Sequence, residues 1–411
     1  MDRFSKSLFA FLLVFGGPAF AAEPTPSGPS EVQVMVGSGE LGDDGGVWFN
    51  GAWGDVRFNL PAGRNARGDE LWRIVKKADD SKRQLKVRFD AGAGHIDEKD
   101  SLLVYPICSV SLDEERFEAT GKCGASKGKG SSQEQDLLIG WALEEQGMNA
   151  EGLVRLDRAL AAKSMSPTFR IMALKTRANL LESIGDEMPP LSDESDRALA
   201  AALADYRTLA ELEPNESQHQ LDIASQLEAL GNYAAAADTY RQVMKKWPEE
   251  DYRANISLSA IERRKGNYDE ALQYLNGVSL KNPIGAGMRF YYHRGMTLTK
   301  LKRYDEAAAD FTDGLKDQPD YAWAFTRRAC AFGQLGQLKS AMTDVESALT
   351  KLRQYPGQQG QDFKHNVARL DAIDIQLKTA VAAGSTNPTA AACEGFWHNE
   401  DARKPSKYLT Q

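Results

Sequence analysis

The sequence predicts a multidomain protein in which a small β-rich N-terminal domain precedes an all-α solenoid of helical hairpins with a C-terminal capping helix. Two observations lead to this fold class. Glycine is concentrated in the first region, because residues 31–130 hold 15 of the 35 glycines and residues 133–384 hold 16. Apolar residues often alternate with polar ones in the first region but recur at helical spacing in the second, where a short motif also repeats.

The first 21 residues have the pattern of a secretory signal peptide. Arg3 and Lys6 precede the apolar run Leu8–Phe15, and Ala19-Phe20-Ala21 supplies an A-x-A cleavage pattern. The run is too short for a membrane-spanning helix, which needs about 20 apolar residues. We therefore expect cleavage after Ala21, a periplasmic or secreted protein that does not span a membrane, and a Pro/Ser-rich linker at 22–30.

Export changes how the four cysteines are interpreted, because an oxidising compartment favours disulfides. Cys108 and Cys123 lie in the N-terminal region, whereas Cys330 and Cys393 lie in the C-terminal half. Pairing within each region is the simplest arrangement, and buried free thiols are the alternative. The cysteine and histidine spacings match no zinc motif, so we predict no metal site and no cofactor.

Residues 31–120 are predicted to form the β-rich domain. Alternating apolar residues predict strands at 31–36, 85–89 and 102–107, and Asp69 is placed to cap a short helix over residues 70–78. A barrel and a sandwich both satisfy this pattern. Residues 121–132 are rich in Gly, Lys and Ser and are expected to be a linker.

One motif in this domain matches the G-x-G-x-x-G spacing of dinucleotide-binding turns. It spans Gly37–Gly42, but the residues that follow, Asp43-Asp44-Gly45-Gly46, are a poor helix start and add negative charge. A nucleotide site needs a helix N-terminus at that turn, so a glycine-rich hairpin or loop is expected. Because no catalytic motif is present elsewhere, we assign no catalytic residues and predict that the protein is not an enzyme; a site hidden in the β-rich domain is the least favoured alternative.

A turn motif repeats in the second region. Counted two positions before the aromatic or leucine, the copies lie at Gly231, Gly266, Lys302 and Gly336, so the period is 35, 36 and 34 residues. Each copy has a small residue soon afterwards and a proline later, which predicts a helix, a tight turn and a second helix that packs closely. The small residues are Ala236, Ala271, Ala307 and Ala341, and the prolines are Pro248, Pro283, Pro319 and Pro356.

This pattern resembles tetratricopeptide repeats, whose usual period is 34 residues. The resemblance covers residues 133–384 with about six repeats. Two weaker copies lie upstream, one over Asp136–Ser164 and one with about a dozen extra residues between its helices, at Asp186–Asp196. Phe363–Ala383 has the pattern of an amphipathic capping helix, and residues 385–411 are expected to be a polar tail.

The resemblance implies that the first helix of each repeat lines a groove that holds extended peptides or helices. The residues that we place on or beside it are Arg253, Ile256, Arg263, Arg289, Tyr292, His293, Met296, Trp323, Thr326, Arg327 and Cys330. This set is basic and aromatic, which favours an acidic or extended polypeptide partner, although a solvated face with no partner is the alternative.

Some family members clamp a C-terminal carboxylate with Lys and Asn side chains. Lys175 and Asn179 match the first pair of that clamp, but Asp222 and Ser257 stand where an Asn and a basic residue would be. An acidic group would repel such a ligand, so Lys175 and Asn179 are weak candidates for the partner-binding groove.

The net charge of −8, with 58 acidic and 50 basic residues, argues against a nucleic-acid binder. We therefore predict a non-enzymatic, exported scaffold or adaptor whose groove binds a polypeptide in the bacterial envelope. The rival reading is a glycan- or lipid-binding β-rich domain with the repeats as a docking platform. Its possible stacking groups are Trp48, Trp53 and Trp72.

Overall fold

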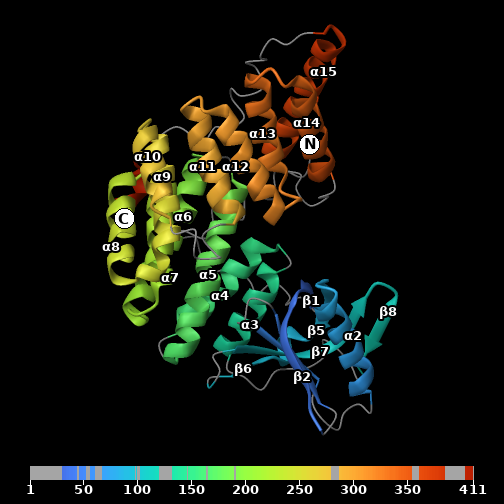
Figure 1. Ribbon diagram of the computed structural model, residues 1–411. Coiled ribbons are helices and arrows are strands. Elements are labelled where there is room, and N and C mark those ends of the chain that lie inside the picture. Colours follow the sequence, from blue (N-terminus) through green and yellow to red (C-terminus); the bar gives the residue numbers. More distant parts are fainter. Residues whose placement is uncertain are drawn as a thin grey trace, which may run out of the picture. The chain divides into compact units, whose positions relative to one another are not determined.

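The computed structural model describes residues 30–43, 46–51, 56–60, 67–97, 99, 102–119, 132–145, 147–162, 165–188, 191–278, 287–353, 361–384 and 403–410. They belong to two compact units, residues 1–214 and 215–411 (Figure 1). The predicted signal peptide lies outside the described residues, as do nearly all of the linkers expected at 22–30 and 121–132. None of the described helices has both the length and the apolar character needed to cross a membrane.

The first unit contains the strands and the first four long helices after them. The strands are β1 (Ser30–Val34), β2 (Val36–Leu41), β3 (Val47–Gly51), β4 (Val56–Leu60), β5 (Leu85–Phe89), β6 (His95–Asp97), β7 (Leu102–Leu112) and β8 (Glu115–Glu118). The helices are α2 (Gly68–Asp80), the short η1 (Ala91–Ala93), α3 (Ser132–Glu144), α4 (Asn149–Leu160), α5 (Pro167–Glu187) and α6 (Asp193–Leu212).

The strands form one eight-stranded mixed sheet, so the described chain forms neither the barrel nor the sandwich that its pattern allowed. The strand order is β1-β5-β7-β4-β3-β2, with β6 and β8 also paired to β7. Only the β4–β7 pair is parallel among the described pairs. The G-x-G-x-x-G motif lies on β2 and its exit, and β2 pairs antiparallel with β3. The expected glycine-rich hairpin is therefore confirmed.

Helix α2 covers one apolar surface of the sheet as its sequence pattern predicts. The side chains that it buries include Leu71, Ile74, Val75 and Ala78, which recur at helical spacing along one face. The helix begins two residues earlier than expected, so Asp69 lies in its first turn and does not cap it. A carboxylate in the first turn still faces the positive end of the helix dipole.

Helix α3 is packed into the same core as the sheet. The Tyr105 ring on β7 stacks on Trp141 of α3 at a centroid distance of 5.1 Å, and the Tyr105 hydroxyl donates to the Leu138 carbonyl at 2.9 Å. The Glu134 carboxylate accepts a bond from the Ile96 backbone N–H at 2.9 Å. The sheet and the first helices thus share one hydrophobic core, which extends to Leu180 of α5.

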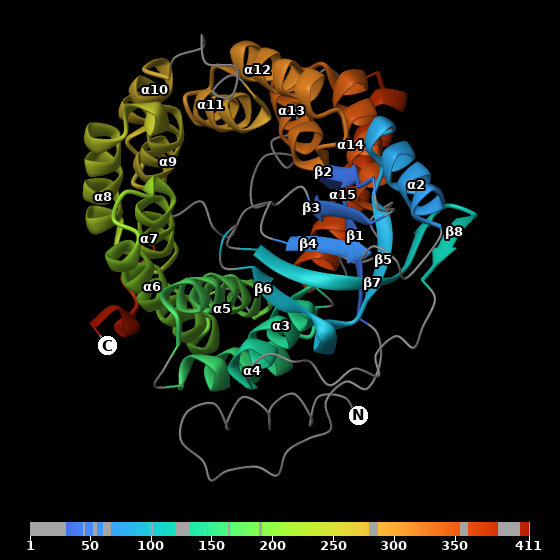
Figure 2. The same ribbon diagram turned by 90° about the horizontal axis from the view of Figure 1, so that it is seen from below.

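The second unit is a row of helical hairpins, which confirms the predicted solenoid class (Figure 2). Its helices are α7 (Ser217–Ala229), α8 (Tyr233–Lys246), α9 (Asp251–Arg264), α10 (Tyr268–Asn276), α11 (Met288–Lys300), α12 (Tyr304–Asp317), α13 (Ala322–Gln334), α14 (Leu338–Arg353) and α15 (Gln361–Ala382), with the short η2 (Pro248–Glu250) and η4 (Lys407–Thr410).

The turn between the helices of each hairpin has the geometry that its sequence predicts. Gly231, Gly266 and Gly336 have φ angles of +81°, +83° and +73°, and Lys302 adopts the same left-handed region at +61°. Glycine adopts this region without steric cost, which explains its recurrence at the end of the first helix. The four predicted small residues, Ala236, Ala271, Ala307 and Ala341, are fully buried.

The weaker repeat formed by α5 and α6 differs from the expectation in one respect. Its extra residues lengthen both helices, to 21 and 20 residues, where an insertion between the helices was expected. A short connection around Leu191 joins them, and Leu191 itself has a φ of +63°. The helices still pack closely at Gly185. A Cβ atom added there would lie only 2.9 Å from the Leu199 side chain.

The last helix closes the row as predicted. Leu370, Ile373 and Leu377 of α15 are buried against α14. The two described cysteines, Cys108 on β7 and Cys330 on α13, are buried, and neither is a free thiol. Cys123 and Cys393 lie outside the described residues, so the pairing within each region stays a prediction.

Candidate polypeptide-binding groove

The first helices of the second unit present one continuous set of side chains, which we call the groove face. Figure 2 shows α7, α9 and α11 on the inner side of the row and α8, α10 and α12 on the outer side. Spacings of three, four and seven residues put side chains on one face of a helix. The groove face consists of Gln218, Ser225 and Ala229 of α7, Arg253, Ser257, Ala260 and Arg264 of α9, Arg289 and His293 of α11, and Trp323 and Arg327 of α13.

The repeat period relates these residues to one another. Trp323 and Arg327 follow Arg289 and His293 by 34 residues, which is one repeat. The structure also joins equivalent positions directly, since Arg253 Nη1 donates to Gln218 Oε1 at 2.9 Å. Arg253 makes a second contact, an ion pair with Glu250 at 3.3 Å.

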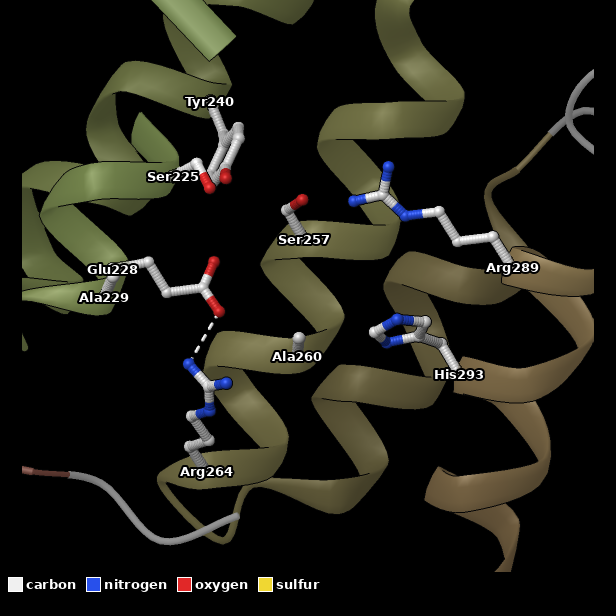
Figure 3. Close-up of a pocket in the computed structure, with 9 residues that line it drawn as sticks. All are labelled: Ser225, Glu228, Ala229, Tyr240, Ser257, Ala260, Arg264, Arg289 and His293. Carbon is white, nitrogen blue, oxygen red and sulfur yellow. Dashed lines mark hydrogen bonds and ion pairs between the residues drawn. The ribbon is translucent and has the colours of Figure 1, made fainter. Parts of the chain in front are cut away.

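A cavity of about 250 Å³ opens on the groove face (Figure 3). Arg289 and His293 point into it from α11, opposite the side chains that α7 contributes. Ser257 and Ala260 of α9 lie between them. The cavity is lined by Ser225, Glu228, Ala229, Tyr240, Ser257, Ala260, Arg264, Arg289 and His293.

One ion pair closes the side of the cavity nearest to the α7 C-terminus. Arg264 Nη1 donates to Glu228 Oε1 at 2.7 Å, and both side chains are largely buried. Burial raises the pKa of Glu228, and the positive charges of Arg264, Arg263 and Arg289 oppose that rise. Glu228 is thus an acidic residue of the cavity lining that lies among several basic side chains.

The pKa of His293 reflects the positive charges that surround its ring. Burial is the largest cause that lowers the pKa of His293 well below its usual value, and Arg263, Arg289, Arg264 and Arg327 lower it further. The ring is therefore neutral near pH 7. Its Nδ1 atom is buried and has no hydrogen-bond partner among the described residues. A neutral ring nitrogen at this position can donate to or accept from a ligand.

Arg289 is the exposed cation of the cavity. It points from α11 toward Ser257 and Tyr240 (Figure 3). A guanidinium in this position can bind a carboxylate with two hydrogen bonds. The cavity can therefore bind an acidic group through Arg289 and His293.

Several residues predicted for the groove serve packing instead. Ile256, Thr326 and Cys330 are buried, and Met296 lies in a core cluster with Phe311. Tyr292 is half-buried, with its ring 5.4 Å from Tyr321.

Other lining residues were missed by reasoning from the sequence. Ser257 precedes His293 by 36 residues, so the repeat period could have placed it on the groove face. Tyr240 is a buried packing residue of α8. Its hydroxyl nevertheless reaches the cavity and forms a hydrogen bond with the Ser257 side chain, while burial raises its pKa. No pattern in the sequence marks Glu228.

The two clamp candidates lie in the first unit, on α5. Lys175 Nζ forms an ion pair with Glu213 at 3.0 Å. The Asn179 Oδ1 atom accepts a bond from the Tyr206 hydroxyl at 3.5 Å. Both side chains thus have partners within their own helical pair.

The tryptophans of the rival reading are partly covered where they are described. Trp48 on β3 is covered by Arg57, whose guanidinium lies 4.6 Å from the ring centroid. Trp72 of α2 packs against the sheet core. Trp53 lies outside the described residues. Among the described residues, no group of three or more His, Cys, Asp or Glu side chains is placed to hold a metal ion.

Comparisons with known proteins agree with the repeat pattern. A family model described as a tetratricopeptide repeat matches residues 194–251, 221–279 and 262–322. No curated protein matches the chain.

Solved structures with likeness to this chain include three proteins of low identity. A tetratricopeptide repeat protein from Parabacteroides merdae ATCC 43184 is 16% identical, with a TM-score of 0.43 over 69% of this chain and 100% of that one. MamA from Desulfovibrio magneticus RS-1 is 18% identical, with a TM-score of 0.34 over 44% of this chain and 98% of that one. YrrB, a tetratricopeptide repeat protein with an unusual peptide-binding site, is 19% identical, with a TM-score of 0.31 over 48% of this chain and 91% of that one.

The matched repeats span α6 to α12 and include all of α7, α9 and α11, the first helices that line the cavity. Their turns, their buried alanines and their period agree with the family pattern. Residues 194–322 thus match the tetratricopeptide repeat in sequence and have the helical hairpins that it predicts.

Proposed function

We propose that this protein is a non-enzymatic, exported scaffold whose groove face binds a polypeptide partner. One observation carries the proposal: the first helices of three consecutive hairpins together line a polar cavity into which Arg289 and His293 point. A binding site that spans several repeats fits an extended ligand, because each repeat can contact a different part of it.

The chemistry of the groove face favours an acidic segment. Arg289 is exposed, Arg253 is partly exposed, and the half-buried Trp323 offers an apolar surface one repeat further on. Arginine and tryptophan are the side chains that most often dominate binding at interfaces. The whole chain has a net charge of −8 and therefore does not attract acidic partners. In this proposal the attraction comes from the basic side chains of the groove face alone.

The exported location belongs to the same proposal. It rests on residues 1–21, whose basic, apolar and small-residue parts follow the order of a secretory signal. Fractionation of cells and N-terminal sequencing test it. The proposal expects mature protein in the periplasm or medium that begins at Ala22, whereas protein that begins at Met1 would contradict cleavage.

Photocrosslinking in cells tests the groove assignment. Ser225 is exposed and lines the cavity, so a photoreactive amino acid at this position would lie beside a bound polypeptide. Ala309, exposed on the second helix α12, provides the matched control. We expect protein adducts from position 225 and few from 309. Equal adduct patterns at both positions would contradict a partner site on the groove face.

A further inference from the structure

The C-terminal residues 403–410 lie on the turn between α7 and α8 (Figure 2), and we call them the C-terminal strap. The Ser406 backbone N–H donates to the Leu230 carbonyl at 2.8 Å, and Ser406 is buried. The Arg403 backbone N–H donates to the Tyr233 hydroxyl at 3.1 Å. This part of the expected polar tail is therefore docked on one turn of the second unit.

The C-terminal strap completes the hydrogen bonding at the end of α7. The last carbonyl groups of a helix have no partner within the helix itself. In α7, the carbonyls of Leu227 and Glu228 accept from backbone N–H groups of the following turn. The next two carbonyls, those of Ala229 and Leu230, accept from the strap. The donor to the first of these is Arg403 Nη1, at 2.9 Å, and its positive charge also favours the C-terminal end of the helix dipole.

Gly231 is the point of close approach between the turn and the strap. A Cβ atom added there would lie 2.7 Å from the Lys404 carbonyl oxygen. Gly266, at the same place one repeat later, has nearly the same φ, +83° against +81°, but a Cβ atom there would meet no described atom within 4 Å. Lys302 occupies this place in the next turn, with a φ of +61°. The turn alone therefore admits a side chain, whereas the docked strap requires glycine at position 231.

The end of α7 that the strap caps is also one wall of the cavity. Ser225, Glu228 and Ala229 belong to the C-terminal part of α7, and all three line the cavity. Glu228 also links this wall to α9, because Arg264 Nη1 donates to its carboxylate at 2.7 Å. Helix ends fray, and a partner for their last carbonyls opposes fraying. The strap is thus placed to hold three lining residues in position.

We propose that the C-terminal strap is a cap, built into this chain, that holds the α7 wall of the cavity in its binding geometry, and that loss of the strap weakens binding at the groove face. Without the strap, the end of α7 loses two hydrogen bonds, and a ligand must order the wall as it binds. Ordering of side chains on binding reduces affinity, so the strap acts by preorganisation. This inference rests on the proposed function for the binding of a polypeptide, but not for the capping of α7.

Gly231→Ala and Gly266→Ala provide a matched pair of variants to test the cap. Both add a methyl group at a left-handed position, but the first meets the strap and the second meets no described atom. Hydrogen exchange of the purified full-length protein, followed by mass spectrometry, compares them. We expect amides in residues 228–232 and 403–410 to exchange about tenfold faster in Gly231→Ala than in Gly266→Ala. Equal exchange in the two variants would overturn the inference.

A second matched pair changes the strap itself. Arg403→Ala and Lys404→Ala each remove one positive charge, but Arg403 donates to the α7 carbonyl whereas the Lys404 side chain is exposed. We expect faster exchange in residues 228–232 for Arg403→Ala and wild-type exchange for Lys404→Ala. The protection of residues 403–410 in the wild type should not depend on protein concentration. Protection that increases with concentration would assign the strap to a second copy and would contradict a cap within one chain.

Photocrosslinking in cells from position 225 tests the effect on binding, in the Gly231→Ala and Gly266→Ala backgrounds. We expect the yield of partner adducts to fall at least about threefold in Gly231→Ala and to stay at the wild-type level in Gly266→Ala. Faster exchange in Gly231→Ala with undiminished adducts would overturn the inference and leave the proposed function standing. Absence of adducts in every background, the wild type included, would refute the proposed function, and the exchange comparison would then decide the capping of α7 alone.

Discussion

Arg328 and Asp344 form a bidentate ion pair between the two helices of one hairpin. Arg328 Nε and Nη2 donate to the two carboxylate oxygens of Asp344 at 2.8 and 2.7 Å. One repeat earlier, Arg294 and Asp310 make the same contact at 2.7 and 2.6 Å. Both aspartates are buried, so the pairs act as repeated, partly buried links between first and second helices.

We expect Asp344→Asn to destabilise the second unit. The change removes the carboxylate and leaves the Arg328 charge in a mostly buried position, a loss of about 3 kcal/mol in unfolding free energy. The midpoint of thermal unfolding, followed by circular dichroism, should fall by several degrees. Glu306→Gln removes the exposed pair with Arg303 and serves as the control, with an expected effect much smaller than that of Asp344→Asn. Equal shifts in both variants would show that burial does not set the strength of these pairs.

Ala307→Leu tests the packing register of the repeats. Ala307 is fully buried between the helices of its hairpin, so extra methylene groups should overpack it at a cost of about 1–3 kcal/mol. Ala309→Leu on the exposed side of the same helix is the matched control and should have little effect. Thermal unfolding measures both. Unchanged stability in Ala307→Leu would count against the register.

Glu144 should make the first unit less stable as the pH rises. Burial, with the charge of Glu145 as the second cause, raises the pKa of Glu144 to about 8. The folded protein therefore keeps this proton after the unfolded chain has lost it, and the unfolding free energy falls by up to about 1.4 kcal/mol per pH unit between these pKa values. We expect Glu144→Gln to reduce the fall between about pH 5 and 8 in denaturant titrations. If the unfolding free energy of the variant falls with pH as steeply as that of the wild type, Glu144 is excluded as the source of this pH dependence.

Peptide mapping without reduction tests the cysteine pairing. We expect Cys108 joined to Cys123 and Cys330 joined to Cys393, the arrangement that keeps each bond within its region. Reduction should lower stability by about 2–4 kcal/mol per bond. A bond between Cys108 and Cys330 would refute the prediction.

The hairpins could be predicted from the sequence because each repeat contains residues that are typical of its turn. Gly231, Gly266 and Gly336 mark the left-handed positions, and the alanines mark the close contacts. The groove face was harder to predict, because a one-residue change of register moves a side chain by about 100° around a helix. Arg289 and His293 line the cavity, whereas Ile256, which we also expected on the groove, lies in the core.

Contacts between distant residues left no local signal in the sequence. Tyr105 and Trp141 stack across 36 positions of chain, and the sheet therefore shares its core with α3. Arg403 and Ala229 meet across 174 positions. Neither contact is marked by a periodic pattern or a motif in the sequence, since each depends on how whole secondary-structure elements pack against each other.

Partner capture with a reversed groove charge tests the central claim most directly. The variant carries Arg253→Glu and Arg289→Glu, and the control carries Arg241→Glu and Lys316→Glu on the second helices, with the same change in net charge. Both are compared with the wild type by affinity capture from envelope extracts and quantitative mass spectrometry. We predict that the groove variant loses its partner by about tenfold or more while the control retains it. Undiminished capture by the groove variant would contradict a polypeptide site on this face.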